Sequence, residues 1–320
     1  MSISETGPCP RTIGTAGPGR HPDTVADGAA SRRAGTLVGL GAILLWATLA
    51  PLGVAVGGVP PFLLTGAAFL IGGLFLLLAL PLRGRPLAAG FRASPVAWAI
   101  GVGGFFGYHA VYFSALQLLP PVDALLVINL WPLLIVLFSA LLPGERLLPR
   151  HLVGALLGLA GTSLIVLGRG ELGGGGSLGG WACAGAAALI WSGYSILNRR
   201  FAAGTPSEAV VGFCLVTALL SLATGLLVEP PALPAGWGWP ALLLLGLGPV
   251  GLAFLLWDRG TKTGDIRILG AAAYAGPLIG TLLLLLMGRA QPSWRLLLAA
   301  VLIVGGSLLA SGDLLRRPRA

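Results

Sequence analysis

The chain has 320 residues, of which 56% are hydrophobic and 10% charged, with a formal net charge of +9. Soluble domains average about 25% charged residues, so this chain cannot cover a water-facing surface, and it is too apolar to be disordered. Its 51 glycines and 24 prolines show no three-residue period, which excludes collagen, and membrane helices tolerate both residues.

The first 34 residues are rich in Gly, Pro, Ala and Thr and contain no long apolar stretch. We therefore expect residues 1–34 to form a disordered cytoplasmic tail. No short apolar segment precedes the first span, which argues against a cleavable signal peptide. An uncleaved signal anchor is the alternative interpretation of residues 36–56.

Ten stretches of about 20 mostly apolar residues follow, and each is long enough to cross a bilayer as a helix. Short turns that contain Gly or Pro separate them, as at 57–61, 120–121 and 230–231. The sequence therefore predicts an all-α membrane protein with ten transmembrane helices, followed by a basic cytoplasmic tail at 314–320. The expected spans are 36–56, 61–81, 95–118, 121–142, 151–168, 179–201, 207–228, 238–258, 265–287 and 293–312.

Positive residues are distributed unevenly between the two sides that these spans define. If the N-terminus lies inside, seventeen Lys and Arg residues are cytoplasmic, and only Arg169, Arg289 and Arg295 lie outside. Cytoplasmic loops carry such an excess, so we expect a multi-pass protein of the bacterial inner membrane with both termini cytoplasmic. The positive charge then faces the lipid bilayer, and we expect no nucleic-acid partner, because no nucleic-acid-binding motif is present.

The cysteines provide no chemistry of their own. Cys9, Cys183 and Cys214 show no metal-ligand spacing, and an odd number at these positions gives no disulfide framework. Small buried apolar side chains are the simplest interpretation. We expect neither a metal ion nor a cofactor.

The two halves of the chain resemble each other in the order of their distinctive residues. Each half has five predicted spans, so the second copy enters the membrane from the opposite side, as an inverted-topology repeat. We place the first five-helix repeat at 35–170 and the second at 179–313. Transporters with this architecture bind substrate near the membrane midplane, between the repeats. The matching pairs are Trp46 with Trp191, Asp123 with Asp265, Pro132 with Pro277, and Gly161 with Gly305.

A family resemblance is carried by the end of the first half. The pattern Asp123…Pro132…Gly144-Glu145…Gly154…Gly161 resembles the EamA-type permeases of the drug/metabolite transporter superfamily, over about residues 36–312. In the second half, Arg289 stands where the repeat usually carries Glu. Residues 107–113 and 129–132 are similar to the YddG-type amino-acid exporters. The resemblance implies a secondary transporter whose cavity is walled by spans 3, 4, 8 and 9, with spans 1 and 6 as gates.

Polar side chains in membrane spans usually face the bundle interior, and the third and fourth spans are rich in them. Tyr108 and Tyr112 share a helix face, and His109 neighbours Tyr112. We interpret these three residues as a substrate-binding wall; a neutral His109 bonded to a backbone carbonyl in a packed bundle is the alternative. Asn129 and Trp131 lie beside a proline break and are further candidates for substrate contacts, whereas a lipid-facing position is the alternative for Trp131.

Aromatic residues and prolines mark three further spans. Trp191 and Tyr274 are candidates for substrate contacts and Trp46 for a gate, with plain helix packing as the alternative for each. Aromatic faces attract ammonium groups and cover apolar side chains, so the set suits an amino acid. Proline interrupts helical hydrogen bonds, and the candidate hinges are Pro51, Pro132 and Pro277.

Charged residues are missing from the middle of every predicted span. An anionic substrate should be matched by a deep Lys or Arg, and Lys262, the only lysine, is predicted in a loop. We therefore expect a neutral or zwitterionic small-molecule substrate, and no catalytic residue is evident. The predicted function is export of amino acids, including aromatic ones, by a monomeric transporter with alternating access. The alternatives are transport of another metabolite or drug, an intramembrane enzyme, and a non-transporting scaffold.

Overall fold

The structure is a computed structural model that describes residues 22–168, 176–289 and 291–311. Within these ranges all regular secondary structure is helical. Five of the helices begin at a proline, which is favoured at a first helical position because the missing N–H has no partner there. These prolines are Pro22, Pro61, Pro95, Pro121 and Pro149.

The first half of the chain forms five spans, three of which are interrupted. The first consists of α1 (Pro22–Trp46) and α2 (Leu49–Val56), and the second is α3 (Pro61–Leu82). The third contains a π-helical segment, and the fourth is broken near its middle. Their parts are α4 (Pro95–Val102), η2 (Gly103–Gly107) and α5 (Tyr108–Leu118), then α6 (Pro121–Ile128) and α7 (Trp131–Phe138), before the fifth span, α8 (Pro149–Leu167).

The second half has the same order of spans, except that its first span is a continuous helix. The sixth and seventh spans are the continuous helices α9 (Leu178–Phe201) and α10 (Val210–Val228). The eighth again contains a π-helical segment and the ninth a break, at the positions that correspond to those of the first half. Their parts are α11 (Gly238–Leu245), η5 (Gly246–Leu252) and α12 (Ala253–Thr263), then α13 (Ile266–Ala272) and α14 (Ala275–Leu286), before the tenth span, α15 (Trp294–Ala310).

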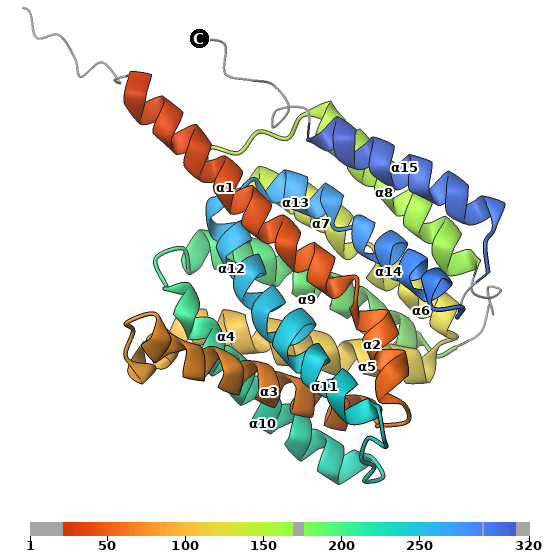
Figure 1. Ribbon diagram of the computed structural model, residues 1–320. Helices are drawn as coiled ribbons and strands as arrows, with labels where there is room; N and C mark the ends of the chain where they lie inside the picture. The colour runs from red at the N-terminus through yellow and green to blue at the C-terminus, as the bar shows by residue number, and fades with distance from the viewer. Residues whose placement is uncertain (1–21, 169–175, 290, 312–320) are drawn as a thin grey trace, which may run out of the picture.

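Among the described residues, nine helices are long and apolar enough to cross a membrane, and α15 is a shorter apolar helix of 17 residues. At 1.5 Å per residue α15 is about 26 Å long, slightly less than a typical hydrocarbon core. It packs along the whole of α8 (Figure 1). The predicted all-α, ten-helix membrane architecture is confirmed, with a short last helix.

The first helix begins earlier than the sequence predicts. α1 starts at Pro22, so the expected disorder is wrong from there to residue 34, and residues 1–21 lie outside the described residues. Ala and Arg favour a helix that is already nucleated in the membrane. Arg32 is also fixed by hydrogen bonds to Glu145 and Asp265. The N-terminal end of α1 projects beyond the bundle in Figure 1.

The contacts between the two halves follow the symmetry of the repeat. α3 packs on α10 and α8 on α15, each against its own counterpart, while α1 packs on α12 just as the counterpart of α1, α9, packs on α5 (Figure 1). Glycines permit the closest approaches. A Cβ on Gly154 would lie 2.5 Å from the carbonyl oxygen of Gly306, and one on Gly260 would lie 2.4 Å from the Cα of Gly39.

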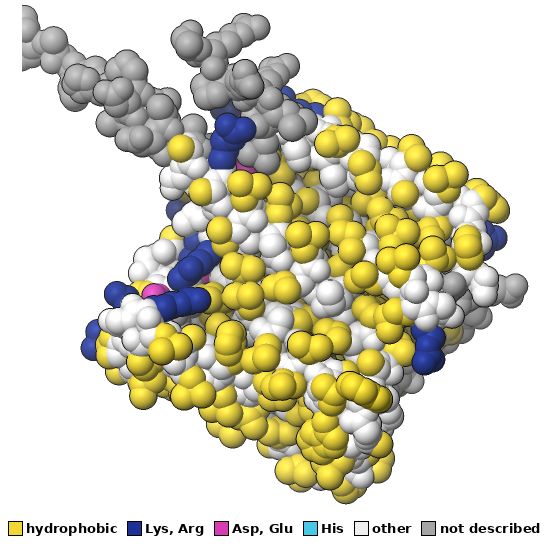
Figure 2. All heavy atoms as spheres, viewed as in Figure 1, with side chains coloured by type: hydrophobic (Ala, Val, Ile, Leu, Met, Phe, Trp, Pro, Cys, Tyr) yellow, Lys and Arg dark blue, Asp and Glu magenta, His cyan; other side chains and the backbone are white. Residues whose placement is uncertain are grey.

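Large apolar side chains cover the outside of the bundle. Leu82, Leu227 and Trp237 are each at least 85% exposed, an arrangement that only lipid can accommodate at this scale. Figure 2 shows hydrophobic side chains over most of the visible face, with basic side chains gathered mainly at the end from which α1 projects. The chain is therefore a multi-pass membrane protein.

Candidate functional site

Three prolines lie next to the breaks in the first, fourth and ninth spans. Pro51 follows the break between α1 and α2, Pro132 is the second residue of α7 after the break at Asn129, and Pro277 follows the break between α13 and α14. Each proline lacks an N–H, so the helical ladder loses one hydrogen bond near the break. Residues of all three breaks, Ala47, Asn129 and Ala273, border one common space between the helices.

A cavity of about 280 Å3 occupies that space. Its wall comes from α1, α2, α5, α6, α7, α8, α9, η5, α12, the break after α13, and α14, so both repeats contribute, and spans 1, 5 and 6 join the four spans expected to line it. Nine of the residues predicted for substrate contacts, gates or hinges belong to this wall. They are Trp46, Tyr108, His109, Tyr112, Asn129, Trp131, Pro132, Trp191 and Pro277.

His109 belongs to the cavity wall and uses one of its two ring nitrogens within its own helix. Its Nδ1 lies 2.7 Å from the carbonyl oxygen of Phe105, which can only accept, so Nδ1 carries the hydrogen. The rings of Phe69 and Tyr108 stand edge-on to the imidazole at 5.2 Å. The structure thus combines the two interpretations of His109, because the ring is bonded to a backbone carbonyl and still belongs to the cavity wall.

An aromatic cluster forms the floor of the cavity, with Trp191 at its centre. Trp191 is 4% exposed, and its ring centroid lies 5.5 Å from that of Trp46, 5.3 Å from Tyr108 and 5.6 Å from Phe254. Trp257, which is fully buried, completes the floor at 5.0 Å from Trp46. The sequence predictions did not include Phe254 or Trp257, although both lie on the eighth span, which the family resemblance assigns to the wall.

Two predicted residues lie outside the cavity wall. Pro51 is buried in α2, one turn beyond the wall residue Ala47. It follows the helix break but does not line the cavity. Tyr274 is fully buried, its ring lies against Gly158 of α8, and its hydroxyl accepts a hydrogen bond from Leu133 N at 3.2 Å. The amide of Leu133 follows a proline at the start of α7, so Tyr274 satisfies a backbone donor that the break leaves free.

We expect Tyr274→Phe to destabilise the protein without changing substrate affinity. The variant removes one buried hydrogen bond, which lowers the free energy of unfolding by about 1 kcal/mol. Thermal unfolding in detergent should show a lower midpoint, while the KM for transport stays that of the unmodified chain. A KM that rises several-fold would indicate that Tyr274 contacts the substrate.

A polar layer lies beneath the aromatic floor. Trp257 Nε1 donates to Ser195 Oγ at 3.1 Å, and one turn further Asn198 Nδ2 donates to Asp258 Oδ1 at 2.8 Å. Lys262 Nζ lies 2.9 Å from the same carboxylate oxygen. The prediction of Lys262 in a loop is wrong, because α12 continues to Thr263, and the buried Asp258 stabilises the ammonium group one turn later.

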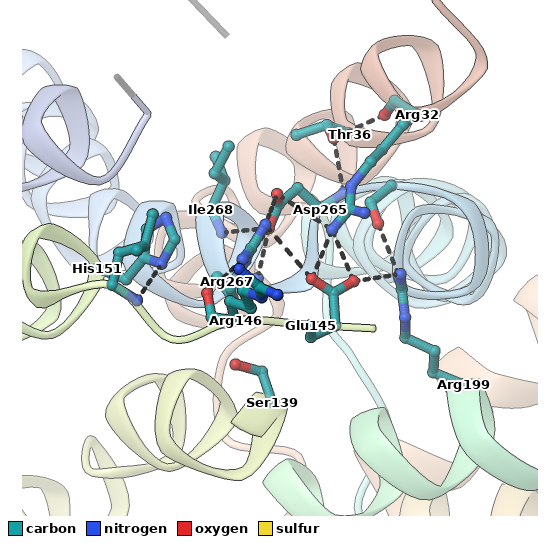
Figure 3. Close-up of polar contacts among 12 residues, drawn as sticks. Arg32, Thr36, Ser139, Glu145, Arg146, His151, Arg199, Asp265, Arg267 and Ile268 are labelled. Atoms are coloured by element: carbon teal, nitrogen blue, oxygen red, sulfur yellow. Dashed lines mark hydrogen bonds and ion pairs between the residues drawn. The ribbon is translucent and has the colours of Figure 1, made fainter. Parts of the chain in front are cut away.

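An ion-pair network centred on Glu145 lies on the same side of the cavity as the polar layer (Figure 3). Glu145 accepts from Arg32 at 2.6 and 2.7 Å and from Arg199 at 2.7 Å, and Arg267 lies 3.3 Å away. The side chain of Glu145 is only 4% exposed. The network joins α1, the turn before α8, α9 and the start of α13, and therefore both repeats.

Asp265 is the second acid of this network. It caps α13 by accepting from two amides of the first turn, and it pairs with the guanidinium of Arg267. Burial alone would raise the pKa of this carboxyl, but the hydrogen bonds and charge of Arg267, with the charge of Arg32, lower the pKa to about 2. Asp265 therefore stays ionised throughout the physiological pH range.

The sequence predictions place Glu145 and Asp265 only near span ends and do not connect them. The one local signal for the position of Glu145 is the glycine before it. Gly144 has a positive φ of 77°, which glycine adopts readily, and this allows a tight turn directly before Glu145. The partners Arg32 and Arg199 lie 113 and 54 residues away along the chain. Only the packing of α1 and α9 brings them to Glu145.

The cavity is closed on the arginine-rich side and extends toward the other. Arg32 and Trp46 are 14 residues apart in α1, so about 21 Å of packed aromatic, polar and ionic layers separate the network from the cavity floor. In the opposite direction the wall reaches Val166, one residue before α8 ends. The structure is thus closed on the side where the Glu145 network lies.

These features define a class of protein. Two five-helix repeats that enclose one cavity between broken helices, closed on one side, are the architecture of a secondary transporter. The model of the EamA-like transporter family matches the chain twice, at residues 33–167 and 179–312, and the chain belongs to this family. The resemblance found in the sequence is confirmed.

Several relatives of the chain are named as exporters. The chain is 52% identical over 285 residues to the aromatic amino acid exporter YddG of Ancylobacter novellus, covering 88% of this chain and 98% of that protein. It is 28% identical to the aromatic amino acid exporter YddG of Salmonella typhimurium, over 86% of this chain and 95% of the relative. A crystal structure of a 50% identical protein superposes with a TM-score of 0.83, covering 90% of this chain and 100% of that one.

Proposed function

We propose that this protein exports aromatic amino acids across the bacterial cytoplasmic membrane by alternating access between its two repeats. The observation that carries the proposal is the cavity wall, in which tryptophan and tyrosine rings surround a small number of neutral polar groups. Such a wall covers an aromatic side chain and hydrogen-bonds its polar end. The names of the relatives support the same substrate class.

The charge of the cavity supports a zwitterionic substrate. Among the described residues that line it there is no Asp, Glu, Lys or Arg. A permanently anionic substrate would require a fixed cation, because burying an unpaired charge is costly. The two charges of an amino acid balance each other, so the zwitterion needs no counter-ion from the wall.

The positions of the closed layers support a cavity that is open away from the cytoplasm in this state. Seventeen of the twenty positive residues belong to the side that we propose to be cytoplasmic, where both termini then lie. In this state the cavity is sealed from the cytoplasm by the aromatic floor, the polar layer and the Glu145 network. In the opposite state these layers separate, and the helices around the other end of the cavity close.

Flux in proteoliposomes tests the function. Purified protein should move labelled phenylalanine, tyrosine and tryptophan down a concentration gradient faster than protein-free vesicles do. His109→Ala and Trp131→Ala should each reduce the rate at least about tenfold, because each removes a wall group that contacts substrate. Movement of another solute class without any flux of aromatic amino acids would refute the substrate, and unchanged rates in both variants would refute the site.

A further inference from the structure

Two polar side chains of the cavity wall, His109 and Asn129, use a donor within their own helix and keep an acceptor. Because His109 Nδ1 donates to Phe105 O, its Nε2 is a free lone pair in the neutral ring. The rings of Phe69, Tyr108 and Phe254 surround the imidazole, and removing a charged imidazolium from water is costly, which favours the neutral ring. Asn129 Nδ2 donates to Leu125 O at 2.8 Å, so the amide keeps its accepting Oδ1 and one N–H.

The helix breaks add backbone acceptors to the same wall. Each proline of the three breaks deprives the carbonyl four residues earlier of its helical donor. The Ala273 carbonyl takes a substitute bond from Gly276 N at 3.1 Å and keeps its second lone pair. At membrane depth such carbonyls need a donor from water or a ligand. The prolines are Pro51, Pro132 and Pro277, and the wall residues whose carbonyls they release are Ala47, Ile128 and Ala273.

The tryptophan rings of the wall favour the same sign of charge. An aromatic face carries a negative quadrupole and attracts a cation, most strongly when the ring is that of tryptophan and water is excluded. Trp46, Trp131 and Trp191 all belong to the wall. The donors that remain, indole N–H and tyrosine O–H groups, are neutral, so the wall stabilises a positive charge better than a negative one.

We propose that the cavity recognises the ammonium group of its ligand, and that the ligand's carboxylate is dispensable for binding. The ligand class is then an aromatic ammonium compound, of which an aromatic amino acid is one member. This inference rests on the proposed function for the location of the site. It goes further in assigning which end of the zwitterion carries the recognition.

Competition by two analogues of phenylalanine tests the assignment. Phenethylamine keeps the ammonium group and lacks the carboxylate, whereas 3-phenylpropionate keeps the carboxylate and lacks the ammonium group. Phenethylamine should inhibit the flux of labelled phenylalanine at concentrations about tenfold or more below those needed for 3-phenylpropionate. Equal inhibition, or stronger inhibition by 3-phenylpropionate, would overturn the inference.

A binding measurement separates this inference from the proposed function. Quenching of tryptophan fluorescence in the purified protein reports ligand binding without any transport. Tighter binding of phenethylamine than of 3-phenylpropionate supports ammonium recognition even if phenylalanine is not exported, in which case only the proposed function fails. Flux of phenylalanine with tighter binding of 3-phenylpropionate overturns the inference and leaves the proposed function intact.

A variant of the wall provides a second test. Asn129→Asp places a carboxylate in the wall, and it should strengthen binding of phenethylamine relative to phenylalanine about tenfold, because the substrate carboxylate is repelled. Gln117→Glu is the matched control, since Gln117 is exposed near the end of α5, outside the cavity wall, and undergoes the same change of amide to acid. A binding ratio that does not move in Asn129→Asp, or that moves toward phenylalanine, would count against the inference.

Discussion

Replacing Glu145 with glutamine should open the cytoplasmic side of the cavity. The glutamine keeps the shape of the side chain but removes the carboxylate charge that Arg32, Arg199 and Arg267 share. Breaking a buried ion pair costs about 3–5 kcal/mol, and Arg32 is 38% exposed, so solvent screens part of this. We expect the closed state to lose at least about tenfold in population relative to the state open to the cytoplasm.

A cysteine beneath the aromatic floor measures this change. Ser195→Cys, in a chain whose native cysteines are replaced by alanine, is buried between the cavity and the network. In inside-out vesicles an impermeant maleimide should label it at least about tenfold faster when Glu145→Gln is present. Glu208→Gln is the control on the same side, because its pair with Arg85 is longer, at 3.6 Å, and partly exposed. Equal labelling in both variants would contradict a sealing role for Glu145.

Trp191→Ala should cause the largest loss of transport among single substitutions in the cavity wall. The side chain is 4% exposed and contacts rings from the first, third, fourth and eighth spans, so its removal leaves a void that the cluster cannot close. Large-to-small changes of buried aromatic residues cost about 3–5 kcal/mol. We expect flux of aromatic amino acids to fall more than about tenfold and the unfolding temperature to drop.

Two variants distinguish the cavity contact from general damage. Trp181→Ala removes a tryptophan from the same helix, but Trp181 is 40% exposed at the start of α9, so flux and thermal stability should stay near those of the unmodified chain. Trp191→Phe keeps an aromatic face and should retain more transport than Trp191→Ala. If Trp191→Ala transports normally once it is folded in vesicles, the aromatic floor does not contact substrate.

Local patterns predicted the parts of the site that depend on one helix. Tyr112 lies four residues after Tyr108 and three after His109, and such spacing makes side chains neighbours on the helix surface wherever the helix packs. The prolines likewise marked the breaks, because the loss of an N–H is a covalent property of the residue. Tyr274 has the same local signals, a break and a nearby proline, yet it faces α8 and fills the space above Gly158.

The sequence by itself determined the membrane class, the number of spans and the inverted repeat. The spans follow because the backbone can be buried in lipid only as long apolar helices, and the inversion follows because each repeat has an odd number of spans. Tertiary structure alone decided which of the polar groups near the span ends meet. Glu145 and Asp265 are brought together with arginines up to 233 residues away, and no periodicity encodes a contact of that range. The direction of each helix face also depended on packing between the repeats. For that reason Phe254 lines the cavity and Trp257 packs beneath Trp46, while Tyr274 accepts a hydrogen bond from a backbone amide instead of lining the cavity.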